Sequence, residues 1–395
     1  MFDRHAGGER TLLVQIDIGS VTDRAERLEE IQLLAESAGG AVQTVITGRR
    51  PSPDPATFAG KGKVEEIAHA VKSAGIDVVI FNHELSPGQQ RNLERAVQCR
   101  VIDRTALILD IFALRAQSAE GKAQVELAQL EHLATRLVRG WTHLERQRGG
   151  IGLRGPGEKQ LETDRRLLGE RIKALKLRLE KLDRQRNTQR KQRQKSPQLN
   201  VSIVGYTNAG KSTLFNALTR AGVYAANQLF ATLDMTSRKL FIQDSGNLVI
   251  SDTVGFIRDL PHGLVAAFHA TLEATVEADV LLHVVDSASS TKDLQIDSVN
   301  AVLQEIGADS VPQLLVLNKS DLTGLPAIEE RDAYGRIARL RVSAKSGDGL
   351  DLLRAALGEY AVEKRTRFQR DPGDQNNPEN IGSDNFSETI SGMNS

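Results

Sequence analysis

The stretch Gly205-Tyr206-Thr207-Asn208-Ala209-Gly210-Lys211-Ser212 decides the fold of this chain of 395 residues. It matches the phosphate-binding pattern G-x4-G-K-S/T. It follows an apolar run at 199–204 and precedes a segment with helical spacing. In that context the glycines let backbone N–H groups wrap a phosphate chain, and the helix N-terminus adds its positive end. The pattern therefore predicts a P-loop between a strand and a helix of an α/β domain.

Further groups of the phosphate site follow from the chemistry of phosphoryl transfer. Lys211 is placed to bridge the β- and γ-phosphates, and Ser212 to put its hydroxyl on Mg²⁺. The segment Asp252-Thr253-Val254-Gly255 ends another apolar run. There we expect Asp252 to hold Mg²⁺ through a water molecule and the N–H of Gly255 to bind the γ-phosphate.

A threonine that closes over Mg²⁺ in the triphosphate state is expected between these two motifs. The segment Phe230-Ala231-Thr232-Leu233-Asp234 lies there, and we assign Thr232 to this role, with Thr236 as the competing candidate. Loss of the γ-phosphate would release both this segment and the one around Gly255. Hydrolysis then becomes a conformational signal.

The base is predicted from Asn318-Lys319-Ser320-Asp321, which follows the apolar run 314–317. The Asp321 carboxylate can accept hydrogen bonds from N1–H and the exocyclic amine of guanine, donors that adenine does not offer as a pair. We expect Asn318 to orient the loop and the stem of Lys319 to cover the base. The segment Ser343-Ala344-Lys345 would offer a backbone N–H to guanine O6. Motifs in this order at successive strand ends predict GTP and GDP as ligands.

One residue departs from the pattern of small GTPases. Phe256 follows Gly255 where a water-orienting Gln is common, and a phenyl ring neither accepts a proton nor bonds water. We therefore expect slow intrinsic hydrolysis unless another group helps. Asn208 is one candidate, because an Asn at this position of some GTPases helps hold K⁺ near the phosphates. The alternative is that Asn208 only bonds the loop backbone.

The complete set of predicted residues is as follows. The predicted GTP contacts are Gly205, Tyr206, Thr207, Asn208, Ala209, Gly210, Lys211, Ser212, Thr213, Phe230, Thr232, Asp252, Thr253, Val254, Gly255, Asn318, Lys319, Asp321, Ser343, Ala344 and Lys345. The predicted Mg²⁺ ligands are Ser212, Thr232 and Asp252, and the predicted catalytic residues are Lys211, Thr232, Gly255 and Asn208.

Periodicity divides the α/β chain into four parts. In 1–113, apolar runs alternate with helical patterns, which predicts a small parallel α/β domain. In 114–196, heptad spacing on both sides of the glycine-rich tip 149–157 predicts an antiparallel helical hairpin. We expect a GTPase domain with a doubly wound, mostly parallel sheet in 197–362, and a disordered polar tail in 363–395. The segment 48–62, rich in Pro and Gly, is expected to be a loop.

The hairpin carries a strong charge excess. Between Arg136 and Lys195 there are 19 Lys or Arg and 7 Asp or Glu, a net of +12 in a chain whose total charge is zero. On a projecting element this favours RNA as a partner, because Arg pairs with phosphate and stacks on bases. An acidic groove of a protein partner and a merely solvated helix face are the alternatives.

Bulk composition narrows the setting. The single cysteine, Cys99, excludes an intramolecular disulfide and fits a reducing compartment. No apolar run reaches the about 20 residues of a membrane span. The first ten residues lack the apolar region of a signal peptide. We expect a cytoplasmic monomer, and peripheral membrane association of a part of it stays open.

The stretch from Gly149 to Arg166, GGIGLRGPGEKQLETDRR, resembles the signature of the HflX GTPases. The Asp252-Thr-Val-Gly-Phe-Ile257 segment, Asn208 and Phe58-Ala-Gly-Lys-Gly-Lys63 match as well. The resemblance, over about residues 11–362, implies a GTPase that binds the large ribosomal subunit and its rRNA and splits stalled ribosomes. A switch that recruits a protein partner through the hairpin is the alternative.

Some members of this family bind ATP through the N-terminal domain. In this chain Gly60-Lys-Gly-Lys63 is the candidate phosphate contact for such an ATP site, although no complete motif accompanies it. A role of the same residues in a loop and helix start is the alternative.

Overall fold

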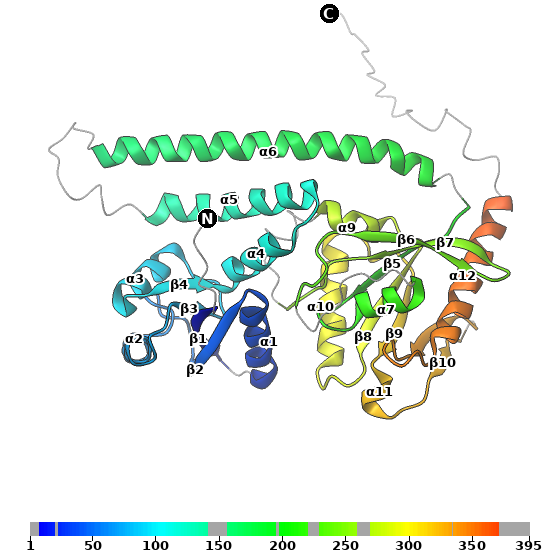
Figure 1. The fold of residues 1–395 in the computed structure, drawn as a ribbon, viewed down its shortest axis with the longest axis horizontal. Coiled ribbons are helices and arrows are strands. Elements are labelled where there is room, and N and C mark those ends of the chain that lie inside the picture. Colours follow the sequence, from blue (N-terminus) through cyan, green and yellow to red (C-terminus); the bar gives the residue numbers. More distant parts are fainter. Residues whose placement is uncertain are drawn as a thin grey trace, which may run out of the picture.

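Two α/β domains lie side by side in the computed structural model, and a pair of long helices extends above them (Figure 1). The structure describes residues 8–19, 23–140, 156–194, 197–219, 229–258, 269–333 and 335–370. The longer of the two helices, α6, passes over both domains (Figure 1).

The N-terminal domain is a four-stranded sheet of order β2-β1-β3-β4 in which every pair is parallel. Its two faces bury different helices, with α1 and α4 on one side and α2 and α3 on the other. This confirms the predicted parallel α/β arrangement. The elements are β1 (Glu9–Ile18), α1 (Arg24–Ser37), β2 (Gly40–Arg50), α2 (Lys61–Ala74), β3 (Val78–Phe81), α3 (Pro87–Val97), β4 (Arg100–Asp103) and α4 (Arg104–Arg115).

The hairpin consists of α5 (Ala119–Gly140) and α6 (Pro156–Gln194), which run antiparallel (Figure 1). Its seam buries Leu127 and Leu175, with Leu130, Ile172 and Leu179 packed against them. These are positions of the predicted heptads. Most of the predicted tip and the end of the first arm, residues 141–155, lie outside the described residues. Of the predicted tip, residues 156–157 instead begin α6, where proline costs no hydrogen bond.

The GTPase domain is a seven-stranded sheet of order β10-β11-β9-β8-β5-β7-β6. Only β6–β7 and β10–β11 are antiparallel pairs, so the predicted mostly parallel sheet is confirmed. Helices α7 and α12 cover one face, and α9 and α10 cover the other. The elements are β5 (Asn200–Gly205), α7 (Lys211–Thr219), β6 (Thr236–Ile242), β7 (Gly246–Asp252), α9 (His269–Val276), β8 (Val280–Asp286), α10 (Lys292–Glu305), β9 (Gln313–Asn318), α11 (Ser320–Thr323), β10 (Ile328–Arg331), β11 (Ile337–Arg341) and α12 (Leu350–Arg370).

Two predicted boundaries are wrong. Helix α12 continues to Arg370, so 363–370 are helical and not part of a disordered tail. Polar anchors explain this. Lys364 Nζ donates to Gln198 O at 2.8 Å and pairs with Asp279 at 2.6 Å, while Arg365 bonds the carbonyl of Ser245. Residues 48–50 belong to β2 rather than to a loop, and α2 already begins at Lys61.

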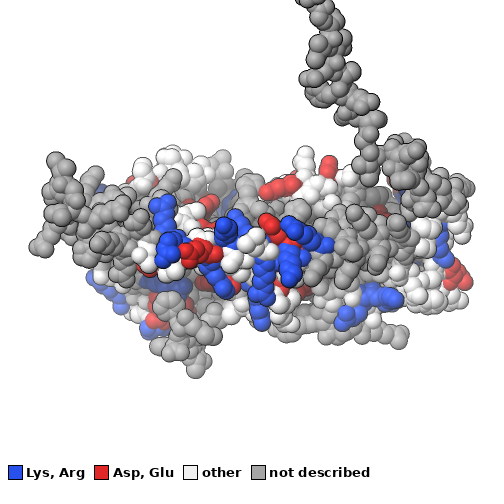
Figure 2. Space-filling model, turned by 90° about the horizontal axis from the view of Figure 1, so that it is seen from above, with Lys and Arg blue, Asp and Glu red and all other residues white. Residues whose placement is uncertain are grey.

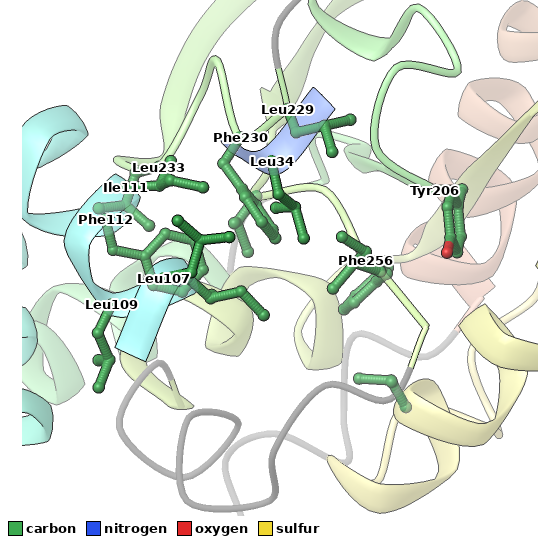
Figure 3. Close-up of a cluster of buried hydrophobic side chains, with 14 of the residues drawn as sticks. Leu34, Leu107, Leu109, Ile111, Phe112, Tyr206, Leu229, Phe230, Leu233 and Phe256 are labelled. Atoms are coloured by element: carbon green, nitrogen blue, oxygen red, sulfur yellow. The ribbon is translucent and has the colours of Figure 1, made fainter. Parts of the chain in front are cut away.

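The two α/β domains share one apolar core. It joins Leu107 and Phe112 of α4 to Phe230, Leu233 and Phe256 of the GTPase domain (Figure 3). All five side chains are at most 2% exposed. The segments predicted to sense the γ-phosphate are therefore packed against the N-terminal domain.

Candidate nucleotide-binding site

The P-loop connects β5 to α7 and needs glycine at both its ends. Gly205 has φ +146°, and a Cβ there would lie 2.2 Å from the carbonyl oxygen of Val284. Gly210 has φ +92°, and a Cβ there would lie 2.3 Å from the amide nitrogen of Asn318. The loop therefore lies directly against the ends of β8 and β9.

Lys211 lies at the floor of the loop, 6% exposed, and its Nζ donates to the carbonyl of Tyr206 at 2.8 Å. Burial lowers the pKa of Lys211 to about 8, and the charge of Asp252 opposes this. Gly255 adjoins the ammonium group, since a Cβ on it would lie 2.8 Å from Lys211 Nζ. The predicted catalytic lysine and the predicted γ-phosphate N–H donor are thus neighbours.

The three predicted Mg²⁺ ligands converge from three segments. Ser212 Oγ lies 2.8 Å from Thr232 Oγ1 and donates to Asp252 Oδ2 at 2.7 Å. Thr232 Oγ1 donates to the same carboxylate oxygen at 3.1 Å. The competing candidate, Thr236, is the first residue of β6. Hydroxyl and carboxylate oxygens in this arrangement suit a hard cation.

Asp252 also supplies a test of whether a cation fits. Its Oδ1 is buried and has no hydrogen-bond partner among the described residues. Burial raises the pKa of Asp252, while the hydroxyl of Ser212 and the charge of Lys211 lower it. A buried carboxylate with an unused oxygen is costly unless a cation compensates it. The residues present therefore fit Mg²⁺ between Ser212, Thr232 and Asp252.

A cavity of about 60 Å³ lies next to this oxygen cluster. It is lined by residues of the P-loop, of the switch segment and of the segment after β7. The lining residues are Thr207, Asn208, Gly210, Lys211, Ser212, Thr213, Phe230, Ala231, Thr232, Thr253 and Gly255. Ala231 was not among the residues predicted from sequence, although it lies between two that were.

The predicted base-reading residues form a second connected group. Asn318 donates its amide to the carbonyl of Ala209 at 2.9 Å, and its Oδ1 accepts the N–H of Ala344 at 2.9 Å. Asp321 accepts a hydrogen bond from Ser343 Oγ at 2.7 Å. Asn318 thereby ties the P-loop to both predicted guanine loops.

Two cationic side chains border this group. Lys319 has φ +65°, and its Nζ lies 2.7 Å from Asp286 Oδ2 at the end of β8. Lys345 is exposed to solvent. The base-reading group and its bordering residues belong wholly to the GTPase domain.

Some predicted contacts also serve the interdomain interface. The hydroxyl of Tyr206 pairs with Glu30 of α1 and accepts the backbone N–H of Arg258 at 2.8 Å. Burial and the Glu30 charge raise the pKa of Tyr206 far above its ordinary value. Val254 is 5% exposed within the shared core, and Thr253 donates its hydroxyl to the carbonyl of Ile203 at 2.6 Å.

Sequence reasoning missed the residues that hold the segment after Gly255. Arg104 of α4 donates to the carbonyl of Arg258 at 2.8 Å and pairs with Glu30 at 2.6 Å. The guanidinium of Arg258 pairs with Asp23. No local motif marks Asp23, Glu30 or Arg104, so only the fold reveals this group.

Asn208 has φ +61° and lines the phosphate cavity. In the described part of the chain its side chain has no hydrogen-bond partner, so the alternative of a bond to the loop backbone is not realised here. In the N-terminal domain, Gly60 directly precedes α2 and Lys63 Nζ pairs with Glu66 at 2.6 Å. This geometry agrees with a helix start, and ATP binding there stays a prediction.

Three features together define a P-loop GTPase. They are a phosphate-binding loop, a cluster of oxygen ligands for a cation, and a separate carboxylate at the end of a strand that lies two strands away from the loop in the sheet. In this chain an α/β domain and a helical hairpin precede the GTPase domain. Within the described ranges, no helix is both long enough and apolar enough to cross a membrane.

Comparison with known proteins narrows this class. A family model described as GTP-binding GTPase N-terminal matches residues 25–113, and GTP-binding GTPase Middle Region matches 115–193. A third, described as 50S ribosome-binding GTPase, matches 200–319.

Individual relatives also match over most of this chain. GTPase HflX of Escherichia coli (strain K12) is 57% identical over 91% of this chain and 84% of its own length. GTPase HflX of Caldanaerobacter subterraneus subsp. tengcongensis is 48% identical over 88% of this chain and 80% of its own. The solved complex of SsGBP with GDP has 26% identity and a TM-score of 0.51, covering 90% of this chain and 99% of that one. The chain belongs to the HflX family of GTPases, and it is an enzyme that hydrolyses GTP.

Proposed function

We propose that this GTPase binds the large ribosomal subunit and its rRNA through the hairpin and uses GTP to split or remodel stalled ribosomes in the cytoplasm. The observation that carries the proposal is the cationic outer face of α6. Residues 163–184 contain eight Lys or Arg, all exposed, and four Asp or Glu. Figure 2 views this side of the molecule, where Lys and Arg side chains gather with fewer acidic ones among them.

Ion pairs within the hairpin do not neutralise this face. Arg171 and Lys176 pair with Glu126 and Glu131 of α5, and Arg166 and Arg184 pair with Glu170 and Glu180 of α6 itself. Four other cations have no acidic partner among the described residues. They are Arg165, Lys173, Arg178 and Lys181. Unpaired, exposed cations on one helix are available to phosphates, and such contacts make binding depend on salt. The family match to a ribosome-binding GTPase domain supports the same partner.

The described residues divide the work of hydrolysis. Lys211 and the N–H of Gly255 would stabilise charge on the transferred phosphoryl group. Ser212, Thr232 and Asp252 would hold Mg²⁺, which when bound neutralises charge on the β- and γ-oxygens. The ring of Phe256 is 1% exposed in the shared core, so it does not orient the attacking water. Asn208, whose side chain has no hydrogen-bond partner among the described residues, would hold K⁺ near the phosphates.

The test is GTP turnover by the purified protein in K⁺ buffer, with and without large ribosomal subunits. We expect at least tenfold stimulation, about 1.4 kcal/mol of barrier lowering. A variant with Arg165, Lys173, Arg178 and Lys181 each changed to Glu should lose the stimulation but keep its basal turnover. The matched control changes four exposed cations outside the hairpin, Lys72, Arg95, Lys239 and Lys292, to Glu.

The outcomes separate the candidates. Stimulation that survives the hairpin variant would reject α6 as the binding face. Absence of stimulation with intact GTP binding would reject the ribosome as partner. It would favour the switch that recruits a protein, for which the exposed Leu167 and Leu177 of α6 offer apolar contacts. Equal turnover in Na⁺ and K⁺ would reject the K⁺ role of Asn208.

A further inference from the structure

The switch segment that carries Thr232 is attached to the base of the hairpin, defined here as residues 117–121. The carboxylate of Asp234 accepts the backbone N–H groups of Gln117 and Ser118 at 2.7 and 2.8 Å. It also accepts the hydroxyl of Ser118, whose Oγ in turn accepts the N–H of Gly121 at 2.8 Å. Ser118 therefore caps the first turn of α5, where N–H groups lack partners within the helix, and Asp234 of the GTPase domain holds this capping residue in place.

The fit at this contact is close. A Cβ on Gly121 would lie 2.3 Å from Asp234 Oδ1, so glycine is required for the carboxylate to approach. The hydrogen bonds to Asp234 are charge-assisted, which makes them about twice as strong as neutral ones.

A second contact holds the other end of the segment. Phe230 has φ +55°, a conformation that costs a non-glycine residue on the order of 1 kcal/mol or more. Its ring packs edge-on against Phe112 of α4, with centroids 4.7 Å apart at 76° (Figure 3). The N–H of Leu229 donates to Ser37 Oγ at 3.0 Å. The N-terminal domain therefore stabilises a backbone conformation that is unfavourable by itself.

Thr232 lies two residues from each of these anchors, Phe230 and Asp234. Its hydroxyl is in the cluster with Ser212 and Asp252 while both anchors are engaged. Thr232 therefore lies in the oxygen cluster while the hairpin base is bound to Asp234 in the same structure. Both anchors join the GTPase domain to elements outside it.

We propose that Asp234 and Ser118 form a joint through which the hairpin base positions Thr232 for the triphosphate state. Both are positioning residues, since neither lines the phosphate cavity. The proposal rests on the role assigned to Thr232 above. Because Thr232 would contact Mg²⁺ only while the γ-phosphate is present, the joint should favour GTP over GDP. By linkage, a partner that moves the hairpin changes GTP affinity, and GTP changes affinity for that partner by the same factor.

The experiment measures the affinity of the full chain for GDP and for a non-hydrolysable GTP analogue. Asp234→Asn and Ser118→Ala should each weaken analogue binding about tenfold and leave GDP binding within about twofold. The double variant should be no worse than the stronger single one, because both remove the same contact. Ser118→Thr keeps the hydroxyl and should restore the ratio of analogue affinity to GDP affinity found in the unmodified protein. Asp244→Asn, at an exposed position, and Ser298→Ala, at a half-buried one, both away from the joint, are the matched controls.

Thr232→Ala is the benchmark for the assignment on which the joint rests. Equal loss of GDP and analogue binding in Asp234→Asn would mean a purely structural contact and would overturn the joint. An unchanged ratio in Asp234→Asn, with a lowered ratio in Thr232→Ala, would overturn the joint alone. An unchanged ratio in both would overturn the role of Thr232 and the joint with it.

Discussion

The guanine side and the γ-phosphate side of the nucleotide site are built from different parts of the chain. Asn318, Ala344 and Asp321, with their partners, all belong to the GTPase domain. The segments of Thr232 and Gly255 instead contact α1, α4 and the base of α5. The identity of the nucleotide is read by local elements, and its state by elements that other domains hold in place.

This difference has a physical consequence. A side assembled within one domain keeps its geometry whatever the rest of the molecule does, which suits selectivity. A side that is shared between domains makes contacts with both of them. A change in either domain can therefore shift the conformation of that side. An event at the hairpin would therefore change the geometry of the γ-phosphate side.

The largest expected effect tests the guanine side. Asp321→Asn replaces an acceptor-only carboxylate with an amide that donates, and this suits a carbonyl at position 2 of xanthine better than the amine of guanine. We expect the ratio of GTP to XTP affinity to fall at least about a thousandfold, about 4 kcal/mol. Competitive binding of labelled nucleotides measures it.

If the comparison holds, Asp321→Asn lowers GTP and GDP affinity equally. A change in the ratio of GTP to GDP would show that the two sides are coupled. Asp351→Asn is the matched control, since Asp351 is exposed at the start of α12.

The second prediction concerns the γ-phosphate side and its contact with the N-terminal domain. Arg104 is 5% exposed and donates to Glu30, Asn82 and the carbonyl of Arg258. Arg104→Met leaves the largely buried carboxylate of Glu30, 14% exposed, without its cation, which costs about 3 kcal/mol. We expect a lower thermal midpoint of the full chain, measured by calorimetry.

GDP affinity should stay within about twofold of the unmodified protein, because the guanine side does not include Arg104. Arg100→Met is the control. Arg100 is 47% exposed, with ion pairs at 3.7 Å, and such surface pairs contribute little. Loss of GDP binding in Arg104→Met would contradict the separation of the two sides.

The two sides also differ in how far sequence predicts them. The guanine side can be predicted from tetrapeptides at strand ends, because the ends of neighbouring strands in a parallel sheet lie close together. The strands and the seam through Leu127 and Leu175 follow from periodicity for the same reason. The contact between Asp234 and Ser118 joins residues 116 apart, and Ser118 belongs to no recognisable motif.

Long-range polar anchoring explains the wrong tail boundary as well. The last two turns of α12 are polar, so composition alone suggested disorder. Lys364 reaches Asp279 and Gln198, which are far away in the sequence. Phe256 is similar, since sequence shows that it is not a water-orienting Gln, but only the fold shows that its ring completes a core with α4.

The smallest expected effect concerns acid stability of the GTPase domain itself. His283 of β8 is 2% exposed, and its Nδ1 pairs with Gln313 Oε1 at 3.2 Å. Burial lowers the pKa of His283 to about 4, so the folded protein keeps the imidazole neutral. The unfolded chain takes up a proton at the ordinary pKa of about 6.5. Stability from this group is therefore full above pH 6.5 and is lost as pH falls toward 4.

At pH 5.5 the loss amounts to about 1 kcal/mol. His283→Gln should remove this part of the pH dependence, measured as the difference in unfolding free energy between pH 7 and 5.5 by urea titration. His69→Gln, an exposed histidine of α2, should leave it unchanged. The strand of His283 ends at Asp286, the partner of Lys319, so acid should weaken GDP and GTP-analogue binding alike. A selective loss of analogue binding would place the acid-sensitive element on the γ-phosphate side instead.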